Sequence, residues 1–198
     1  MTNFNKVFSC MAATLAITLA VPGRLAFGLF VLVHFNFLIV ITTLLMHCIR
    51  FLKLESIRVG ILALEIIALT ILFKQLLIIF CPVAALTLGF SIYMPSISAV
   101  ILTIISSKNL QSLKEDVFGK FKEALNVSIF CFIIFFIKDI FGFGTITLPF
   151  WKNLLVINLP VLIKNASVSA FLATIPGTLG LTVIMFFLYL KIKEKNNA

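Results

Sequence analysis

The sequence predicts an all-α integral membrane protein with six transmembrane helices, on two observations: its composition and the length of its apolar runs. Of its 198 residues 62% are hydrophobic and only 12% are charged, and the mean hydropathy is +1.20, well outside the balance of a soluble domain. A bilayer core needs about 20 apolar residues per helix, and continuous runs of this kind differ from the alternating pattern of a membrane β-barrel. The apolar runs cover residues 7–22, 25–49, 59–80, 87–105, 125–143 and 166–190. We therefore expect one polytopic domain over residues 1–198, embedded in a lipid bilayer.

The first and fourth runs differ from the others, because each contains helix-breaking residues. Pro22 and Gly23 end the first run, and Gly89 and Pro95 lie inside the fourth. We expect both to be broken or half-length helices. Each is the first of a set of three, so the chain is interpreted as a 3+3 inverted repeat, in which interrupted helices at matched positions indicate a site near the membrane midplane. The alternative is that Pro95 only kinks a helix.

The basic residues lie between the apolar runs and therefore indicate topology. The net charge is +9, but because of this placement no nucleic-acid partner is expected. If the N-terminus is cytoplasmic, most of the 16 Lys and Arg residues fall on the cytoplasmic side, as the positive-inside rule requires. Both termini are thus predicted to be cytoplasmic. The mixed-charge stretch 106–126 is predicted to be a solvated, helix-prone cytoplasmic loop, with docking of a soluble partner as the alternative.

Glu65 is a candidate functional residue, because it lies in the middle of the third apolar run. A carboxylate at the bilayer centre costs about 2.5 to 3.5 kcal/mol on insertion scales, so such residues are rare and usually functional. We predict that Glu65 is an ion or proton contact, either protonated or paired. Lys74, nine residues later, lies on the opposite helix face, so any partner must come from another segment.

Lys138 and Asp139 lie at the end of the fifth run and are followed by Gly142 and Gly144, a pattern that predicts a structural helix end. The Gly-x-Gly does not predict a phosphate loop, because no strand precedes it and the third glycine of that motif is absent. No catalytic residue is predicted.

The cysteines and histidines predict neither a disulfide framework nor a zinc site. The cysteines lie within or at the edges of apolar runs, without any CxxC spacing. They are Cys10, Cys48, Cys81 and Cys131. His34 and His47 have no carboxylate at ligand spacing, which favours helix-bonded or interfacial histidines over haem or metal ligands.

Four stretches, taken in order, resemble one family. Arg50 with Ile57-Arg58 is similar to that family's "R...IR" between its second and third helices, and "LGFSIYMPSISAVIL" resembles its "LGIFIPLIV-NC-I" segment. "IKDIFGFGTITLPF" is similar to its "REI-G-GTLF", and "SAFLATIPGTLGLTVIMFF" resembles its closing "PFLLAMLPPGAFIGLG". The family comprises the six-helix membrane subunits of the Rnf and Nqr electron-transport complexes; the resemblance is closest to the RnfE and NqrD branch, to which RnfA and NqrE are related.

This resemblance implies a non-autonomous subunit of an ion-translocating oxidoreductase in the bacterial inner membrane. In such a complex, electrons would pass between ferredoxin and NAD through flavin-bearing partner subunits, coupled to Na+ or H+ movement. Each member of the family pairs with a homologous membrane subunit of opposite topology. The two subunits share an iron-sulfur cluster, to which each contributes one cysteine from its first helix and one from its fourth.

The sequence departs from the family at both cysteine positions. Aligned from Leu88-Gly89, the fourth-helix cysteine corresponds to Ala99, and in the first helix Cys10 lies two residues too early, leaving Ala12 in register. In one interpretation Cys10 is a single metal ligand, with the others supplied by partners or by a displaced cysteine such as Cys131. In the other, the cluster site is lost and the subunit is structural or uses another relay. The second is favoured, because both positions are alanine.

The alternative function is the substrate-binding membrane component of a vitamin transporter. The length of the chain, its basic balance and the small-residue stripe Ala12, Ala16 and Ala20 would suit such a component. The two hypotheses differ in their partners, which would be redox subunits in one case and an ATPase pair in the other.

Overall fold

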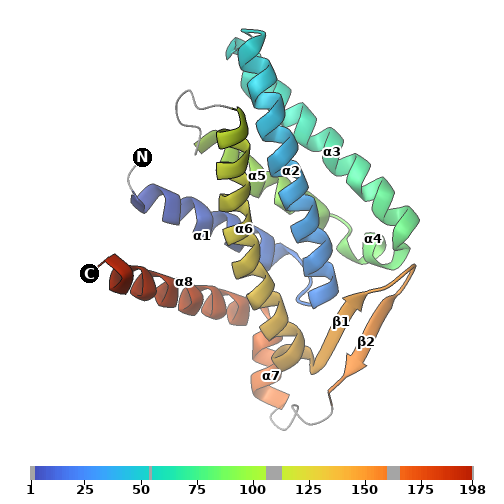
Figure 1. The fold of residues 1–198 in the computed structure, drawn as a ribbon. Helices are drawn as coiled ribbons and strands as arrows, with labels where there is room; N and C mark the ends of the chain where they lie inside the picture. The colour runs from blue at the N-terminus through green and yellow to red at the C-terminus, as the bar shows by residue number, and fades with distance from the viewer. Residues whose placement is uncertain (1–2, 54, 106–112, 160–165, 198) are drawn as a thin grey trace.

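A computed structural model describes residues 3–53, 55–105, 113–159 and 166–197 of the chain, and this part is mostly helical (Figure 1). The main helices are α1 (Asn3–Ala20), α2 (Leu25–Phe51), α3 (Arg58–Phe80), α4 (Pro82–Leu88), α5 (Met94–Ile105), α6 (Leu113–Ile137), α7 (Ala166–Ala173) and α8 (Ile175–Asn197). Short 3-10 turns cover Glu55–Ile57 and Ser91–Tyr93, and a π-helical segment, Lys138–Gly142, continues α6. Two strands, β1 (Thr145–Pro149) and β2 (Leu154–Asn158), form an antiparallel hairpin.

Three of the described helices are long and apolar enough to cross a membrane. They are α2, α3 and α6 with its π-helical continuation, and α4 with α5 makes a fourth candidate if the bent pair is counted as one span. The apolar parts of α1 and α8, Phe8–Ala20 and Ile175–Leu188, are shorter than a full span. These helices are consistent with a multi-pass membrane protein.

The fourth apolar run is bent sharply between α4 and α5. The two pieces meet at 84°, and Gly89 at the bend has φ +48°, a left-handed conformation that side chains other than glycine rarely adopt. Pro95 lies in the first turn of α5, where its missing N–H leaves no helical hydrogen bond unmade. The bend therefore falls at the glycine, and the proline begins the helix that follows.

Two local features differ from the expected all-helical pattern. Residues 145–158 form the β-hairpin, whose Thr145, Thr147 and Ile157 are β-branched, and Lys152 in its turn has a left-handed φ of 66°. The sixth apolar run is divided into α7 and α8 at Thr174. A Cβ at Gly177 would collide with the Phe171 carbonyl oxygen, so this corner depends on glycine.

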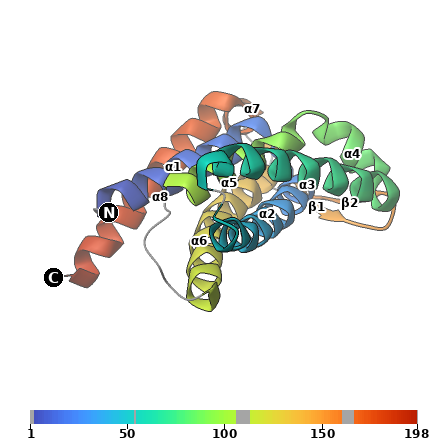
Figure 2. The same ribbon diagram turned by 90° about the horizontal axis from the view of Figure 1, so that it is seen from above.

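The helices pack as pairs around a single large buried cluster. α2 lies along α6 and α1 along α5, with further contacts between α1 and α6 and between α2 and α5. α3 covers α2 and touches α5, whereas α8 covers α1 and touches α6. Figures 1 and 2 show α1 and α8 running to the same side of the molecule, where both termini lie.

Candidate functional site

Residues next to the positions at which the family resemblance places its cluster cysteines meet where α1 and α5 pack together, beside α6. The Ser98 hydroxyl of α5 donates to the Ala13 carbonyl of α1 at 3.1 Å, and the adjacent Ala99 is completely buried. The Cys131 thiol of α6 lies 4.0 Å from the Thr14 carbonyl of α1, and Cys10 lies one turn before Thr14 on α1. The three helices therefore meet where the resemblance expects an iron site.

The side chains at this crossing do not fit a cluster shared between two subunits. Such a cluster lies at a subunit interface, but Cys131 is 0% exposed inside the core of this chain. Ala99 has no ligand atom. Of the two cysteines at this crossing, Cys10 is partly exposed and Cys131 is buried. Across the described ranges, no three His, Cys, Asp or Glu side chains are grouped so as to hold a metal ion.

Asp139 lies in the π-helical segment and connects three parts of the fold. Its Oδ2 accepts from the Leu25 backbone N–H at 3.2 Å, and from both the backbone N–H and the hydroxyl of Thr147 at 2.7 Å each. Its Oδ1 accepts from the Thr145 hydroxyl at 2.8 Å. Arg24, the residue before α2, provides no side-chain cap. The N-terminus of α2 is capped instead by Asp139, which is remote in the sequence.

Lys138 points away from this carboxylate, toward the loop between α1 and α2. Its Nζ donates to the Thr178 hydroxyl of α8 at 2.7 Å, and its side chain is buried. A Cβ at Gly23 would lie 2.5 Å from Lys138 Cε, so the glycine after Pro22 makes room for this side chain. The approach at Gly142 is less close, since an added Cβ would lie 3.2 Å from the Ala173 backbone nitrogen, and Gly144 has φ +64°. Lys138 and Asp139 are thus positioning residues around the start of α2.

Glu65 lies on α3 with both carboxyl oxygens buried and without a hydrogen-bond partner among the described residues. Lys74 does not reach it, since its Nζ lies over the Tyr93 ring, 5.8 Å from the centroid. On the facing helix α2, Thr42 Oγ1 and His34 Nδ1 are also buried and unpartnered within the described part of the chain. The sequence indicated Glu65, but it did not indicate the unpartnered polar groups of α2.

A chain of polar side chains, which we call the Thr70 network, runs from α2 through α3 to the start of α5. Thr70 Oγ1 donates to the Ile66 carbonyl at 2.7 Å, and it lies 3.3 Å from His34 Nε2 and 2.7 Å from Ser96 Oγ. His34 is completely buried and stacks on Phe73 with ring centroids 4.3 Å apart. Sequence reasoning missed Thr70 and Ser96, although small polar residues inside apolar runs are the signal by which such networks could be sought.

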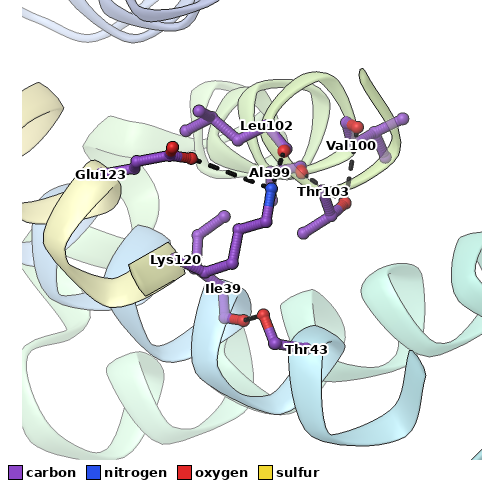
Figure 3. Close-up of polar contacts among 8 residues, drawn as sticks. All are labelled: Ile39, Thr43, Ala99, Val100, Leu102, Thr103, Lys120 and Glu123. Atoms are coloured by element: carbon purple, nitrogen blue, oxygen red, sulfur yellow. Dashed lines mark hydrogen bonds and ion pairs between the residues drawn. The ribbon is translucent and has the colours of Figure 1, made fainter. Parts of the chain in front are cut away.

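α6 also caps the end of α5 through Lys120, as Figure 3 shows. Lys120 Nζ donates to the Leu102 carbonyl at 3.0 Å and lies 3.8 Å from a Glu123 carboxylate oxygen. Thr103 donates to the Ala99 carbonyl at 2.7 Å in the same turn of α5. A cation at the C-terminal end of a helix is favoured by the helix dipole, so this contact holds the end of α5 against α6.

An apolar groove of about 380 Å³ opens between α2, α3 and β1. Its lining consists of Leu29, Phe30, Val33, Phe73, Leu76, Leu77, Phe80 and Pro149. Because these side chains offer no polar group that would recognise a vitamin, the groove suits hydrocarbon chains rather than a polar ligand.

Comparison of the chain with protein-family models, with curated proteins and with solved structures finds no match.

Proposed function

We propose that this chain is a membrane subunit of a redox-driven, ion-translocating complex similar to the Rnf and Nqr complexes, and that it has lost the shared iron-sulfur site. Its partners are a homologous membrane subunit of opposite topology and flavin-bearing subunits that exchange electrons with ferredoxin and NAD. The complex lies in a bacterial inner membrane, and Glu65 is this chain's ion contact.

The observation that carries the proposal is the reciprocal packing of two helix triplets. Let the first triplet be α1, α2 and α3, and the second α5, α6 and α8. In this comparison α1 corresponds to α5, α2 to α6 and α3 to α8. The α1–α6 contact then corresponds to α5–α2, the α1–α8 contact to α5–α3, and the α2–α3 contact to α6–α8. Each of these contacts occurs. The α1–α5 and α2–α6 contacts map onto themselves. This pattern supports a six-span, 3+3 inverted repeat with half-length first and fourth members.

The chemistry of the α1–α5–α6 crossing supports the second part of the proposal. In the family, the first and fourth helices each bring one thiolate to the midplane. Here the same helices meet through the Ser98 hydroxyl and the Ala13 carbonyl, with Ala99 filling the interior. This contact joins the two triplets without a metal, so the chain acts as scaffold and ion contact while electrons pass through its partners.

The experiment is purification of the tagged chain in a mild detergent, with every copurifying protein identified by mass spectrometry. We expect a second six-helix membrane subunit and flavin-bearing subunits in stoichiometric amounts. Recovery of the chain without any related membrane subunit would contradict the proposal. Recovery with an ATPase pair and a retained vitamin would instead establish the transporter alternative.

A further inference from the structure

The apolar groove between α2, α3 and β1 lies near one end of both helices. On α3 four of its lining residues recur at the spacing of a single helix face: Phe73, Leu76, Leu77 and Phe80. On α2 the lining side chains lie in the first three turns of the helix. The groove therefore extends over about 10 Å of α3 and ends where that helix ends, at Phe80.

The turn of the β-hairpin is fixed at the Phe80 end of this groove. The Lys152 backbone N–H donates to the Phe80 carbonyl at 3.0 Å, and the Trp151 ring packs edge-on against the Phe80 ring with centroids 5.6 Å apart. The Cys81 thiol, one residue further along the chain, lies 3.7 Å from the Asn153 carbonyl. Figure 1 shows the tip of the hairpin beside the end of α3. Three contacts thus hold the turn at one end of the groove.

The hairpin turn has the composition of a membrane interface. Phe150, Trp151 and Lys152 are all exposed, and Trp151, the only tryptophan of the chain, is 66% exposed. Trp is enriched where the hydrocarbon core meets the lipid headgroups, and a Lys at this level extends its charge toward the headgroups. The second strand exposes further large apolar side chains, Leu155 and Ile157, which lipid would cover. This composition places the turn at the level of the headgroups and the groove in the apolar layer of one leaflet.

The Lys152 ammonium has no ion pair within the described part of the chain. Its backbone is held beside Phe80 and its four-carbon side chain is flexible, so the charge is within reach of the end of the groove. Two other cations on these helices have ring partners instead. Lys74 Nζ lies 5.8 Å from the centroid of Tyr93, and the Arg24 guanidinium lies 5.7 Å from the centroid of Phe143. An apolar groove that ends beside an unpaired cation matches a molecule with a hydrocarbon chain and an anionic head.

The size and lining of the groove favour a hydrocarbon chain over other occupants. Its volume of about 380 Å³ lies in the range of small-molecule pockets, about 300 to 1,000 Å³. A partner helix is about 10 Å across and would have to lie along the whole of α2 and α3, whereas the groove covers only the last turns of α3. A polar ring inside the groove would lose its hydrogen bonds to water without replacement, because no polar side chain lines it.

We propose that this groove is a binding site for a phospholipid with an anionic headgroup. One acyl chain lies in the groove between α2 and α3, and the Lys152 ammonium donates to the phosphate beside Trp151. The bound lipid then joins the hairpin turn to the two helices that it touches. The inference goes beyond the proposed function and does not depend on it, because a lipid site is neither an electron carrier nor a contact for the pumped ion.

The headgroup preference is tested through the fluorescence of Trp151, which as the only tryptophan reports on this end of the groove alone. The purified chain is reconstituted in phosphatidylcholine vesicles with increasing fractions of phosphatidylglycerol brominated on its acyl chains, or of brominated phosphatidylcholine in parallel. Bromine quenches a tryptophan that it contacts. We expect half-maximal quenching at an about fivefold lower fraction of the brominated phosphatidylglycerol, the preference that one Lys contributes near an anionic lipid.

Two lysine variants separate the site from the general attraction of a basic protein to anionic lipid. Lys152→Gln should remove the preference, whereas Lys74→Gln, which removes a cation directed to Tyr93, should keep it. Equal quenching by the two brominated lipids in the unsubstituted chain, or an unchanged preference in Lys152→Gln, would overturn the assignment of an anionic headgroup.

The place of the acyl chain is tested by native mass spectrometry of the chain purified in a mild detergent from phosphatidylglycerol-containing membranes. Val33→Phe fills the groove from α2 and should lower the amount of retained phosphatidylglycerol several-fold. Leu64→Phe, on an exposed part of α3 outside the groove, is the matched control and should retain the lipid. Both positions are exposed, so neither substitution overpacks the core. Equal retention in the two variants would overturn the site, and so would a quinone or a second copy of the chain found in place of the phospholipid.

Discussion

At the scale of single residues, two buried carboxyl groups show how their surroundings determine their roles. Asp139 accepts four hydrogen bonds from α2 and β1, whereas Glu65 has none among the described residues. A carboxyl group that accepts several hydrogen bonds joins separate parts of the fold, whereas one without donors in an apolar layer is a candidate for a functional contact.

Replacing Asp139 with Asn should destabilise the protein strongly. Asn keeps one acceptor oxygen and introduces an NH2 group that faces other donors, so buried N–H and O–H groups of Leu25, Thr145 and Thr147 lose their acceptor. We expect a loss of about 3 kcal/mol, seen as a lower thermal unfolding midpoint in detergent at a fixed scan rate. Thr145→Ala removes one of the four bonds and should cost only about 1 kcal/mol. Equal stability of Asp139→Asn and the unsubstituted chain would refute the role of Asp139 as the cap of α2.

At the scale of elements, the close approach of α2 and α6 depends on one glycine. A Cβ at Gly28 would collide with the ring of Phe135, which is completely buried. We predict that Gly28→Ala lowers stability by about 1 to 3 kcal/mol, as overpacked cores do. Gly60→Ala on α3, where nothing lies within 4 Å of the added Cβ, is the matched control and should be neutral or slightly stabilising. The prediction fails if both substitutions have the same effect on the unfolding midpoint.

The end of α5 provides a second prediction at this scale. Lys120→Met keeps the length of the side chain but removes the donor to the Leu102 carbonyl, so α5 should fray and the stability should fall by about 1 kcal/mol. Lys122→Met changes an exposed lysine two residues away and should have no effect. The measurement is amide hydrogen exchange at the end of α5, which should be faster in Lys120→Met and unchanged in Lys122→Met. Identical exchange in both variants would show that Lys120 does not cap α5.

How much of the fold the sequence predicts depends on whether the deciding contact is local. The apolar runs predict α2 and α3 closely, because hydrophobic length is a local property, and Gly89 marks the bend between α4 and α5. The fourth and fifth runs were wrong at their starts: α4 begins at Pro82, before residue 87, and α6 begins at Leu113, within the stretch predicted to be a solvated loop. The β-hairpin was missed, since an apolar strand of five residues is not distinguishable by length from part of an apolar run. Pro176 and Gly177 indicate the break at Thr174, but they were overlooked because the sixth run was identified from its apolar residues alone.

The candidate site is less predictable, because its contacts join residues far apart in the chain. Glu65 is identifiable from an acidic residue in an apolar run, but its lack of a partner depends on the register of α2 against α3. The bond from Leu25 to Asp139 spans 114 residues, and no local pattern indicates it. Likewise, the burial of Cys131, which separates it from any shared interface, follows only from the packing of α1 and α2 on α6.

At the scale of the whole molecule, the orientation in the membrane is open to a direct prediction. Cys48 is exposed in the last turns of α2, next to Arg50, whereas Cys131 and Cys81 are buried. A membrane-impermeant maleimide should label Cys48 in inside-out vesicles and not in right-side-out vesicles, if this end of α2 is cytoplasmic. Cys48→Ser is the control that removes this label. Labelling of Cys48 from the outer side alone would reverse the predicted topology and place both termini outside.

The central claim is that this chain is a subunit of a redox-driven ion pump, and the most direct measurement is coupled transport in inside-out vesicles with and without the chain. Ferredoxin–NAD electron transfer and ion uptake are followed together, with the expressed chain restored in trans as the control. The account predicts that both activities are lost when the chain is deleted and return when it is restored, and that Glu65→Gln loses ion uptake. Electron transfer and ion uptake that continue undiminished without the chain would contradict the account.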